Sequence, residues 1–285
     1  MELIGVASGL GAKDHGCEDG PLFLRELNVF QGGKIQAAWD GMLRPDPANI
    51  DEPIVAITEL SVRLAERVQG ALAAGRFPLV VGGDHSCAID TWSGVHQWLG
   101  ARRSLGLTWI DAHMDSHTFG TTPSGALNGM PLACLLGYGD SALTTIVDTA
   151  PKLRPESVCL LGVRSFEEAE AALLKGLGVR VISMDEIRQR GLTATLAEAM
   201  EVARNGTAGY GVSIDLDVLD PAEEPGVGSP VPGGLLCSEL EQALRLLRDD
   251  PKMLAIEIVE YNPHHDRGLL TAKAAGALFR AALAR

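Results

Sequence analysis

The chain has 285 residues, of which 46% are hydrophobic, and this is enough to bury a sizeable core in one large globular domain. Its formal net charge of −13 argues against a nucleic-acid backbone or an anionic membrane surface as the main partner, because both favour lysine and arginine, so the expected partner is a small molecule. The five cysteines are scattered without a CxxC pair, and neither a basic segment followed by an apolar one nor an apolar run of roughly 18 residues occurs, so we expect a cytoplasmic protein.

Short runs of β-branched and aliphatic residues, each expected to form a strand, alternate with longer stretches of helical spacing. The runs are residues 3–7, 77–81, 105–110, 158–163, 179–183, 210–214 and 254–259, and the helical stretches include 54–74, 167–177, 185–204 and 238–248. Strands that alternate with helices favour a parallel sheet with helices on both faces. No internal repeat or linker between domains stands out, so we predict one α/β domain over residues 1–285.

Acidic residues and histidines follow three of the predicted strands. The segments are GGDHS at 82–86, DAHMD at 111–115 and SIDLDVLDP at 213–221. Ligands of open parallel sheets bind beyond the carboxyl ends of the strands, which is where these segments should lie. Side chains two apart on an extended backbone share a face, so Asp111, His113 and Asp115 can converge, as can Asp215 and Asp217.

Six side chains of these segments can ligate a metal: His85, Asp111, His113, Asp115, Asp215 and Asp217. Neighbouring carboxylates repel and raise one another's pKa, whereas one or two divalent ions would neutralise them. A set rich in carboxylate and poor in sulfur suits Mn²⁺ better than a structural zinc, and two ions sharing carboxylates would lower the pKa of a bridging water. A solvated acidic rim is the alternative, but it would not explain the two histidines.

In their order and separation, these segments resemble the motifs of the ureohydrolases, the arginase and agmatinase family. The similarity extends from GCEDGP at 16–21 to VEYNP at 259–263 and on to the last helix, nearly the whole chain. It implies an arginase-like three-layer α/β/α fold, a centre of two Mn²⁺ ions, and hydrolysis of a guanidinium group by a metal-bridging hydroxide. From an arginine-like amino acid the products would be urea and an ornithine-like amino acid, which indicates a role in arginine metabolism.

The resemblance also assigns the site position by position. One ion would be held by His85, Asp111, Asp115 and Asp215, and the other by His113, Asp111, Asp215 and Asp217, with Asp111 and Asp215 bridging. Asp217 would accept the proton of the hydroxide before it passes to the leaving amine, and Asp220 would lie behind the ligands. Glu260 would pair with the planar guanidinium through two charge-assisted hydrogen bonds.

The loop TTPSGALNGMP at 121–131 resembles the substrate loop of arginases, in which Ser124 would bind the α-carboxylate of the substrate. In the segment GVRSFEEAE at 162–170, Glu167 and Glu170 stand where arginases bind the α-ammonium. The alternative for both glutamates is an ordinary place in the first turn of an amphipathic helix, where the helix dipole favours acids.

Three positions of this region depart from the arginase pattern. Ala126 replaces an asparagine, Asn128 replaces a histidine assigned to proton shuttling, and His117 stands where asparagine is usual. An amide cannot replace an imidazole in acid–base work, so Asn128 would instead hydrogen-bond the substrate. We expect His117, two residues beyond Asp115, to supply part of the missing function; the alternative is a histidine that only contacts substrate or solvent.

The substrate is therefore left open among arginine, agmatine, a guanidino acid, N-hydroxyarginine and formiminoglutamate. From a different class, the alternative is a metal-loaded but catalytically silent relative that acts as a sensor or partner protein, and turnover would separate the two. Family members commonly form trimers or hexamers, so the resemblance also leaves a homo-oligomer open.

Overall fold

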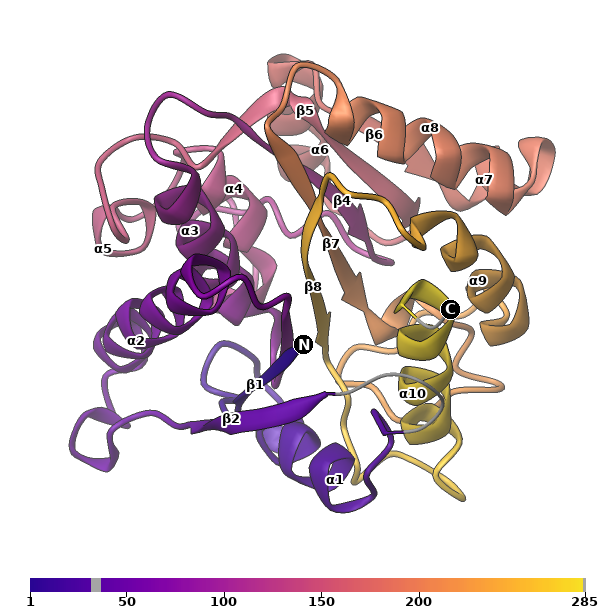
Figure 1. Cartoon of the computed structure of the whole chain (residues 1–285), viewed down its shortest axis with the longest axis horizontal. Helices are drawn as coiled ribbons and strands as arrows, with labels where there is room; N and C mark the ends of the chain where they lie inside the picture. The colour runs from indigo at the N-terminus through magenta and orange to yellow at the C-terminus, as the bar shows by residue number, and fades with distance from the viewer. Residues whose placement is uncertain (32–36, 284–285) are drawn as a thin grey trace.

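The computed structural model describes residues 1–31 and 37–283, so residues 32–36 and 284–285 of the predicted domain lie outside the description. The strands of the described part are β1 Glu2–Val6, β2 Ala38–Leu43, β3 Pro78–Gly82, β4 Leu105–Ile110, β5 Leu153–Val163, β6 Arg180–Ser183, β7 Gly209–Asp215 and β8 Met253–Val259. They form one eight-stranded sheet in the order β2-β1-β3-β8-β7-β4-β5-β6, in which every neighbouring pair is parallel (Figure 1). The predicted parallel α/β class is confirmed.

Helices cover both faces of this sheet (Figure 1). They are α1 Gly20–Glu26, α2 Pro53–Ala73, α3 Ala88–Leu99, α4 Pro131–Leu135, α5 Ser141–Thr144, α6 Glu168–Leu177, α7 Met184–Arg190, α8 Leu192–Arg204, α9 Cys237–Leu244 and α10 Leu270–Leu283. One hydrophobic cluster joins the sheet to α7, α8, α9 and α10, and another joins its opposite face to α2, α3, α4 and α6. The molecule is thus a three-layer α/β/α structure.

The central strands are buried on both faces, which explains why they are apolar throughout rather than alternating. Every residue of β4 and of β7 is buried. Successive residues of β8 join different clusters: Ile256 and Ile258 pack on the α8 side, and Ala255 and Val259 on the α3 side. Packing is close enough that a Cβ on Gly211 of β7 would lie 1.8 Å from the Trp92 ring, so this position requires glycine.

Each predicted strand overlaps an observed one, but two expectations are corrected. The sequence runs omit β2, an edge strand of sequence AWDGML whose residues are mostly partly exposed. The stretch 185–204 is not one helix, because Gly191 at φ 84° separates α7 from α8. Among the described residues, no helix combines the length and apolarity needed to cross a membrane.

Candidate active site

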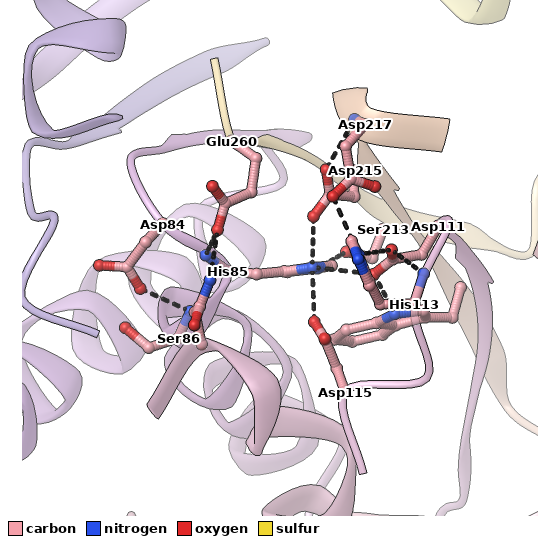
Figure 2. A network of polar contacts seen from close by, with 12 residues as sticks. Asp84, His85, Ser86, Asp111, His113, Asp115, Ser213, Asp215, Asp217 and Glu260 are labelled. Atoms are coloured by element: carbon pink, nitrogen blue, oxygen red, sulfur yellow. Dashed lines mark hydrogen bonds and ion pairs between the residues drawn. The ribbon is translucent and has the colours of Figure 1, made fainter. Parts of the chain in front are cut away.

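The candidate metal ligands lie together at the carboxyl ends of neighbouring strands (Figure 2). His85 begins a short 3-10 helix, η3 (His85–Cys87), after β3; Asp111 follows β4; and Asp215 ends β7. Glu260 follows β8 and accepts a hydrogen bond from the backbone N of His85, 175 positions away in the sequence. The parallel sheet therefore gathers these residues at one edge, as the sequence predicts.

His85 is the centre of the first group. Its Nδ1 lies 3.0 Å from Asp115 Oδ2, 3.0 Å from Asp215 Oδ2 and 3.2 Å from Asp111 Oδ2 (Figure 2). All four residues are buried, and yet Nδ1 has no hydrogen-bond partner of suitable geometry among the described atoms. A buried imidazole nitrogen that faces three carboxylate oxygens has the arrangement of a cation site.

A second group surrounds His113. Its Nδ1 lies 3.0 Å from Asp217 Oδ2 and 3.5 Å from Asp111 Oδ1. Asp111 thus presents one oxygen to each histidine, which is the placement a bridging ligand needs. Asp215 turns Oδ2 toward His85, while its Oδ1 accepts a hydrogen bond of 2.8 Å from the backbone N of Asp217. The potential ligand atoms of His85, Asp111, Asp115 and Asp215 lie within 4.8 Å of one another, and so do those of Asp111, His113 and Asp217; Asp215 is a member of the first group only.

The backbone of the DAHMD segment does not stay extended as expected. Asp115 has a φ of 46°, in the left-handed region, so the chain turns at this residue. The convergence of Asp111 and Asp115 on His85 therefore results from this turn and not from strand alternation. His117, two residues further on, contacts Glu167 and is not a member of the His85 group.

Protons and a metal would compete for this cluster. Burial and the charge of Asp111 raise the pKa of Asp115 to about 8, and burial and the charge of Asp217 raise that of Asp215 well above its usual value. Burial opposes the charged form of His85, but its carboxylate contacts raise the pKa of this imidazole well above the ordinary range. Bound protons would balance the charge of this cluster, and a divalent cation would supply the same positive charge without them.

The orientation of His85 is fixed by residues that the sequence analysis does not identify. Its ring stacks on Trp109 at a centroid distance of 4.2 Å, and its Nε2 lies 2.9 Å from Ser213 Oγ. Ser213 in turn donates a 2.7 Å hydrogen bond to the buried carboxylate of Glu257, in β8. Holding Nε2 in this way leaves Nδ1 to face the aspartates. The only signal in the sequence is a glutamate inside the apolar run 254–259.

The Glu260 carboxylate is buried beside the metal cluster. A φ of 64° at this residue and three donors fix its position: the backbone N of His85 at 2.9 Å, Asn128 Nδ2 at 3.1 Å and Cys17 Sγ at 3.2 Å. Burial and the charge of Asp84 raise the pKa of Glu260 to about 7. The amide of Asn128, expected to contact substrate, is thus engaged by Glu260.

One cavity joins the metal cluster to the residues expected to bind substrate. Its lining includes His113, Asp115, His117, Ser124, Asn128, Glu167, Glu170, Asp215, Asp217 and Glu260, and also Ser229, which no sequence motif identifies. His85 and Asp111 are buried behind this lining. Every predicted metal ligand and substrate-binding residue therefore lines this cavity or is buried behind its lining.

The cavity lining also includes His117 and two glutamates, Glu167 and Glu170. His117 Nε2 lies 2.9 Å from Glu167 Oε2 and 3.5 Å from Glu170 Oε1, and its Nδ1 lies 3.2 Å from Thr121 Oγ1. Glu170 is buried, with its oxygens accepting hydrogen bonds from the backbone N of Glu167 at 3.0 Å and of Ser116 at 3.2 Å. The Glu167 side chain is 57% exposed, so of the two it is the more available to a ligand.

The remaining predicted residues lie at the margin of the site. Ser124 is exposed on the cavity rim, and its Oγ accepts a hydrogen bond of 3.1 Å from the backbone N of Ala126. The Asp220 carboxylate accepts hydrogen bonds from the backbone N atoms of Gly233 and Gly234, at 2.9 Å and 3.0 Å. Asp220 thus stabilises the loop that follows β7.

The chain is similar to known arginases in both sequence and fold. The model described as "Arginase family" matches residues 1–284. An arginase of Bacillus caldovelox is 37% identical over 289 residues, covering 98% of this chain and 96% of that protein. The crystal structure of the arginase from Bacillus subtilis superposes with a TM-score of 0.91 at 34% identity, covering 100% of this chain and 98% of that one. The structure of an Entamoeba histolytica arginase in complex with L-ornithine gives a TM-score of 0.85 at 25% identity, covering 98% of this chain and 97% of that one.

Proposed function

This chain belongs to the arginase family of hydrolases, and we propose that it is a manganese-dependent amidinohydrolase that converts an arginine-like amino acid to urea and an ornithine-like product. One observation carries the proposal: the two groups of histidine and aspartate and the Glu260 carboxylate lie in or directly behind the wall of one cavity. A guanidinium group bound to Glu260 would therefore lie next to the metal ligands.

The residues present fit two divalent ions. The buried His85 Nδ1 without a hydrogen-bond partner and the surplus of carboxylates favour a cation, and oxygen-rich ligands with one imidazole per ion favour Mn²⁺. We assign His85, Asp111, Asp115 and Asp215 to one ion and His113, Asp111, Asp215 and Asp217 to the other. Two bound ions would lower the pKa of a coordinated water and supply a nucleophile near neutral pH.

The protein side chains would bind the substrate and move its protons. Glu260, held by three donors, would orient the planar guanidinium through paired charge-assisted hydrogen bonds. Asp217 Oδ2 faces the cavity beside His113 and would accept a proton and return it to the leaving amine. Catalysis would then depend on Asp217 for proton transfer and on Glu260 for orientation.

In the same cavity, Glu167 would bind the α-ammonium and Ser124 the α-carboxylate, with Glu170 supporting Glu167. We propose that His117, which pairs with Glu167, replaces part of the function lost with the histidine usual at position 128. We expect His117→Ala to lower turnover and change its pH profile, while His264→Ala, on an exposed histidine paired with Asp19, leaves both unchanged. Unchanged kinetics of the His117 variant would remove this residue from the reaction.

The decisive experiment is turnover by the manganese-reconstituted protein of arginine, agmatine, N-hydroxyarginine, guanidinobutyrate and formiminoglutamate. Urea, hydroxyurea or formamide would be quantified together with the amine or amino-acid product, and a Glu260→Gln variant would be the control. We expect arginine to be hydrolysed. If only another compound is hydrolysed, the assigned substrate changes but the proposed class of reaction does not.

A modified guanidine is the second candidate substrate, and the observation that favours it is the engagement of Asn128 with Glu260. An amide at this position cannot protonate a leaving group, which matters less when the leaving group is better. Turnover of none of these compounds by protein with bound manganese would favour the silent relative that acts as a sensor or partner. We further propose that the protein is cytoplasmic and that its chain forms one domain. Such a chain can also assemble into a homo-oligomer.

A further inference from the structure

We propose that Cys17 is a positioning residue that fixes the Glu260 carboxylate for the guanidinium group. This inference rests on the proposed function and adds a residue that none of the site motifs includes. Cys17 lies in the 3-10 helix η1 (His15–Asp19), 243 positions before Glu260, and its Sγ is 3.2 Å from Glu260 Oε2. Both residues are buried, Cys17 with 0% and Glu260 with 2% of their surface exposed.

The two oxygens of Glu260 have different partners. Oε1 accepts hydrogen bonds from the backbone N of His85 and from Asn128 Nδ2, at 2.9 Å and 3.1 Å. For Oε2, the hydrogen bond found among the described residues is that of the Cys17 thiol. Rotation of the carboxylate about its own axis is therefore opposed at one oxygen by nitrogen donors and at the other by sulfur.

The surrounding backbone keeps the thiol against the carboxylate. A Cβ on Gly228 would lie 2.6 Å from Glu260 Oε2 and 3.1 Å from Cys17 Sγ, so only glycine leaves room for the pair. Gly16 lies against Asn262, whose Nδ2 donates a 3.2 Å hydrogen bond to Asp14 just before η1. The segment that carries Cys17 is thus attached to the segment that carries Glu260.

The thiol is suited to donate and not to ionise. Burial and the charge of Glu260 raise the pKa of Cys17 well above its usual value, so the S–H proton is retained at neutral pH. A thiol is a weak donor, and it leaves the carboxylate more of its basicity than a stronger donor would. Oε2 is therefore oriented while it keeps a lone pair that can accept a hydrogen bond from the guanidinium group.

Cys17→Ala, Cys17→Ser and Cys159→Ala in the full-length, manganese-loaded protein test this role kinetically. We expect Cys17→Ala to raise the KM for the guanidino substrate about tenfold with a smaller change in kcat, and Cys17→Ser to restore most of the loss because the hydroxyl also donates. Cys159, buried in β5 away from the cavity, is the matched control and should leave KM unchanged. The proposal would be overturned if all three variants lost the same activity and if this loss matched a loss of bound metal or a fall in Tm.

A second measurement does not depend on turnover and separates this inference from the proposed function. The S–H stretching band of Cys17 would be identified in the infrared spectrum of the wild-type protein by its loss in Cys17→Ala. Donation to a carboxylate shifts this band to lower frequency, and Glu260→Gln should move it back up. A Cys17 band that does not respond to Glu260→Gln would refute the contact, even in an active enzyme.

Discussion

Asp111 is the residue on which both halves of the candidate metal centre depend. Its Oδ1 accepts a 2.7 Å hydrogen bond from the backbone N of His113, and its Oδ2 accepts one of 2.8 Å from Trp109 Nε1. These bonds hold one carboxylate between the two histidines, each of which faces one of its oxygens. A change at this position should disturb both groups together and not one of them.

We therefore expect Asp111→Ala to lose two equivalents of manganese and all turnover, because the variant removes a ligand that both groups share. Metal content after gel filtration, measured by atomic spectrometry, checks this. Asp185→Ala is the matched control, since the Asp185 side chain is 82% exposed and pairs with Arg188 on the surface. Two tightly bound equivalents in Asp111→Ala would refute the ligand assignment.

The sequence assigns the same role to Glu167 and Glu170, but the two residues have different surroundings in the fold. Glu170 uses its oxygens to bind backbone N atoms at the start of α6, where such a contact stabilises the helix. Glu167 faces the cavity, and its contact with His117, opposed by slight burial, lowers its pKa and keeps it charged. We therefore expect Glu167, and not Glu170, to bind an ammonium group directly.

Glu167→Ala should weaken the binding of ornithine roughly tenfold to a hundredfold, the usual effect of losing a charged hydrogen bond. Binding of 5-aminovalerate, which lacks the α-amino group, should hardly change. The inhibition constants of the two compounds against the preferred substrate give the comparison. An equal change in both inhibition constants would show that Glu167 shapes the cavity and does not bind the α-amino group.

The sequence identifies residues of this site only where they stand in dense motifs. His85, Asp111 and Asp215 follow strands directly, so their meeting at one edge follows from parallel pairing. Cys17 lies in the segment GCEDGP and Glu257 in the apolar run 254–259, but the contacts of both depend on how distant segments pack. Such contacts between distant segments have no local signature, so these two roles cannot be predicted from the sequence.

At the scale of elements, the sequence predicts the buried apolar strands of this sheet but not its edge strand β2. β4 was expected with its observed bounds because each of its residues is apolar or small enough to be buried. β2 is partly exposed and mixed in composition, and its place depends on pairing with β1. The break between α7 and α8 depends on Gly191, whose left-handed φ the helical spacing of residues 185–204 does not reveal.

The loop after β7 contains a buried carboxylate that should make stability depend on pH. Glu224 Oε2 has no hydrogen-bond partner among the described atoms, and burial together with the charge of Glu223 raises the pKa of Glu224 to about 7. The native state thus binds a proton that the unfolded state has released, so stability falls as pH rises from about 4.5 through about 7.

Glu224→Gln should therefore raise Tm at about pH 8, by about 2 °C if the relief is roughly 1 kcal/mol, and should change it little at about pH 5. Differential scanning calorimetry at both pH values checks the sign. The exposed neighbour Glu223 provides the matched variant, Glu223→Gln, which keeps the buried carboxylate and should give a smaller rise. A Tm increase of Glu224→Gln only at the lower pH would contradict the argument.

At the scale of the whole molecule, one sheet carries both the core and the site. The strands that position His85, Asp111 and Asp215 are central strands of the sheet, and every residue of these strands is buried. The site is therefore built on the most buried part of the fold, and its charge must be balanced there for the protein to be stable. Metal binding and folding should be coupled through these strands.

Removal of the metal should make this coupling visible as a pH dependence of the whole protein. In the metal-free state the pKa of Asp115 is raised to about 8, and those of Asp215 and His85 are raised well above their usual values. The native state then holds more protons than the unfolded state at neutral pH, so the Tm of chelator-treated protein should fall from about pH 6 to about pH 9.

Manganese requires deprotonated ligands, so its stabilising effect should grow over the same range, and the gap in Tm between loaded and metal-free protein should widen. Asp111→Ala, which is expected not to bind manganese, should show no gap at any pH. A gap that stays constant with pH in the wild-type protein would mean that protons and metal do not share these side chains. The candidate centre would then have to be placed elsewhere, because a metal bound by these aspartates and histidines cannot avoid competition with their protons.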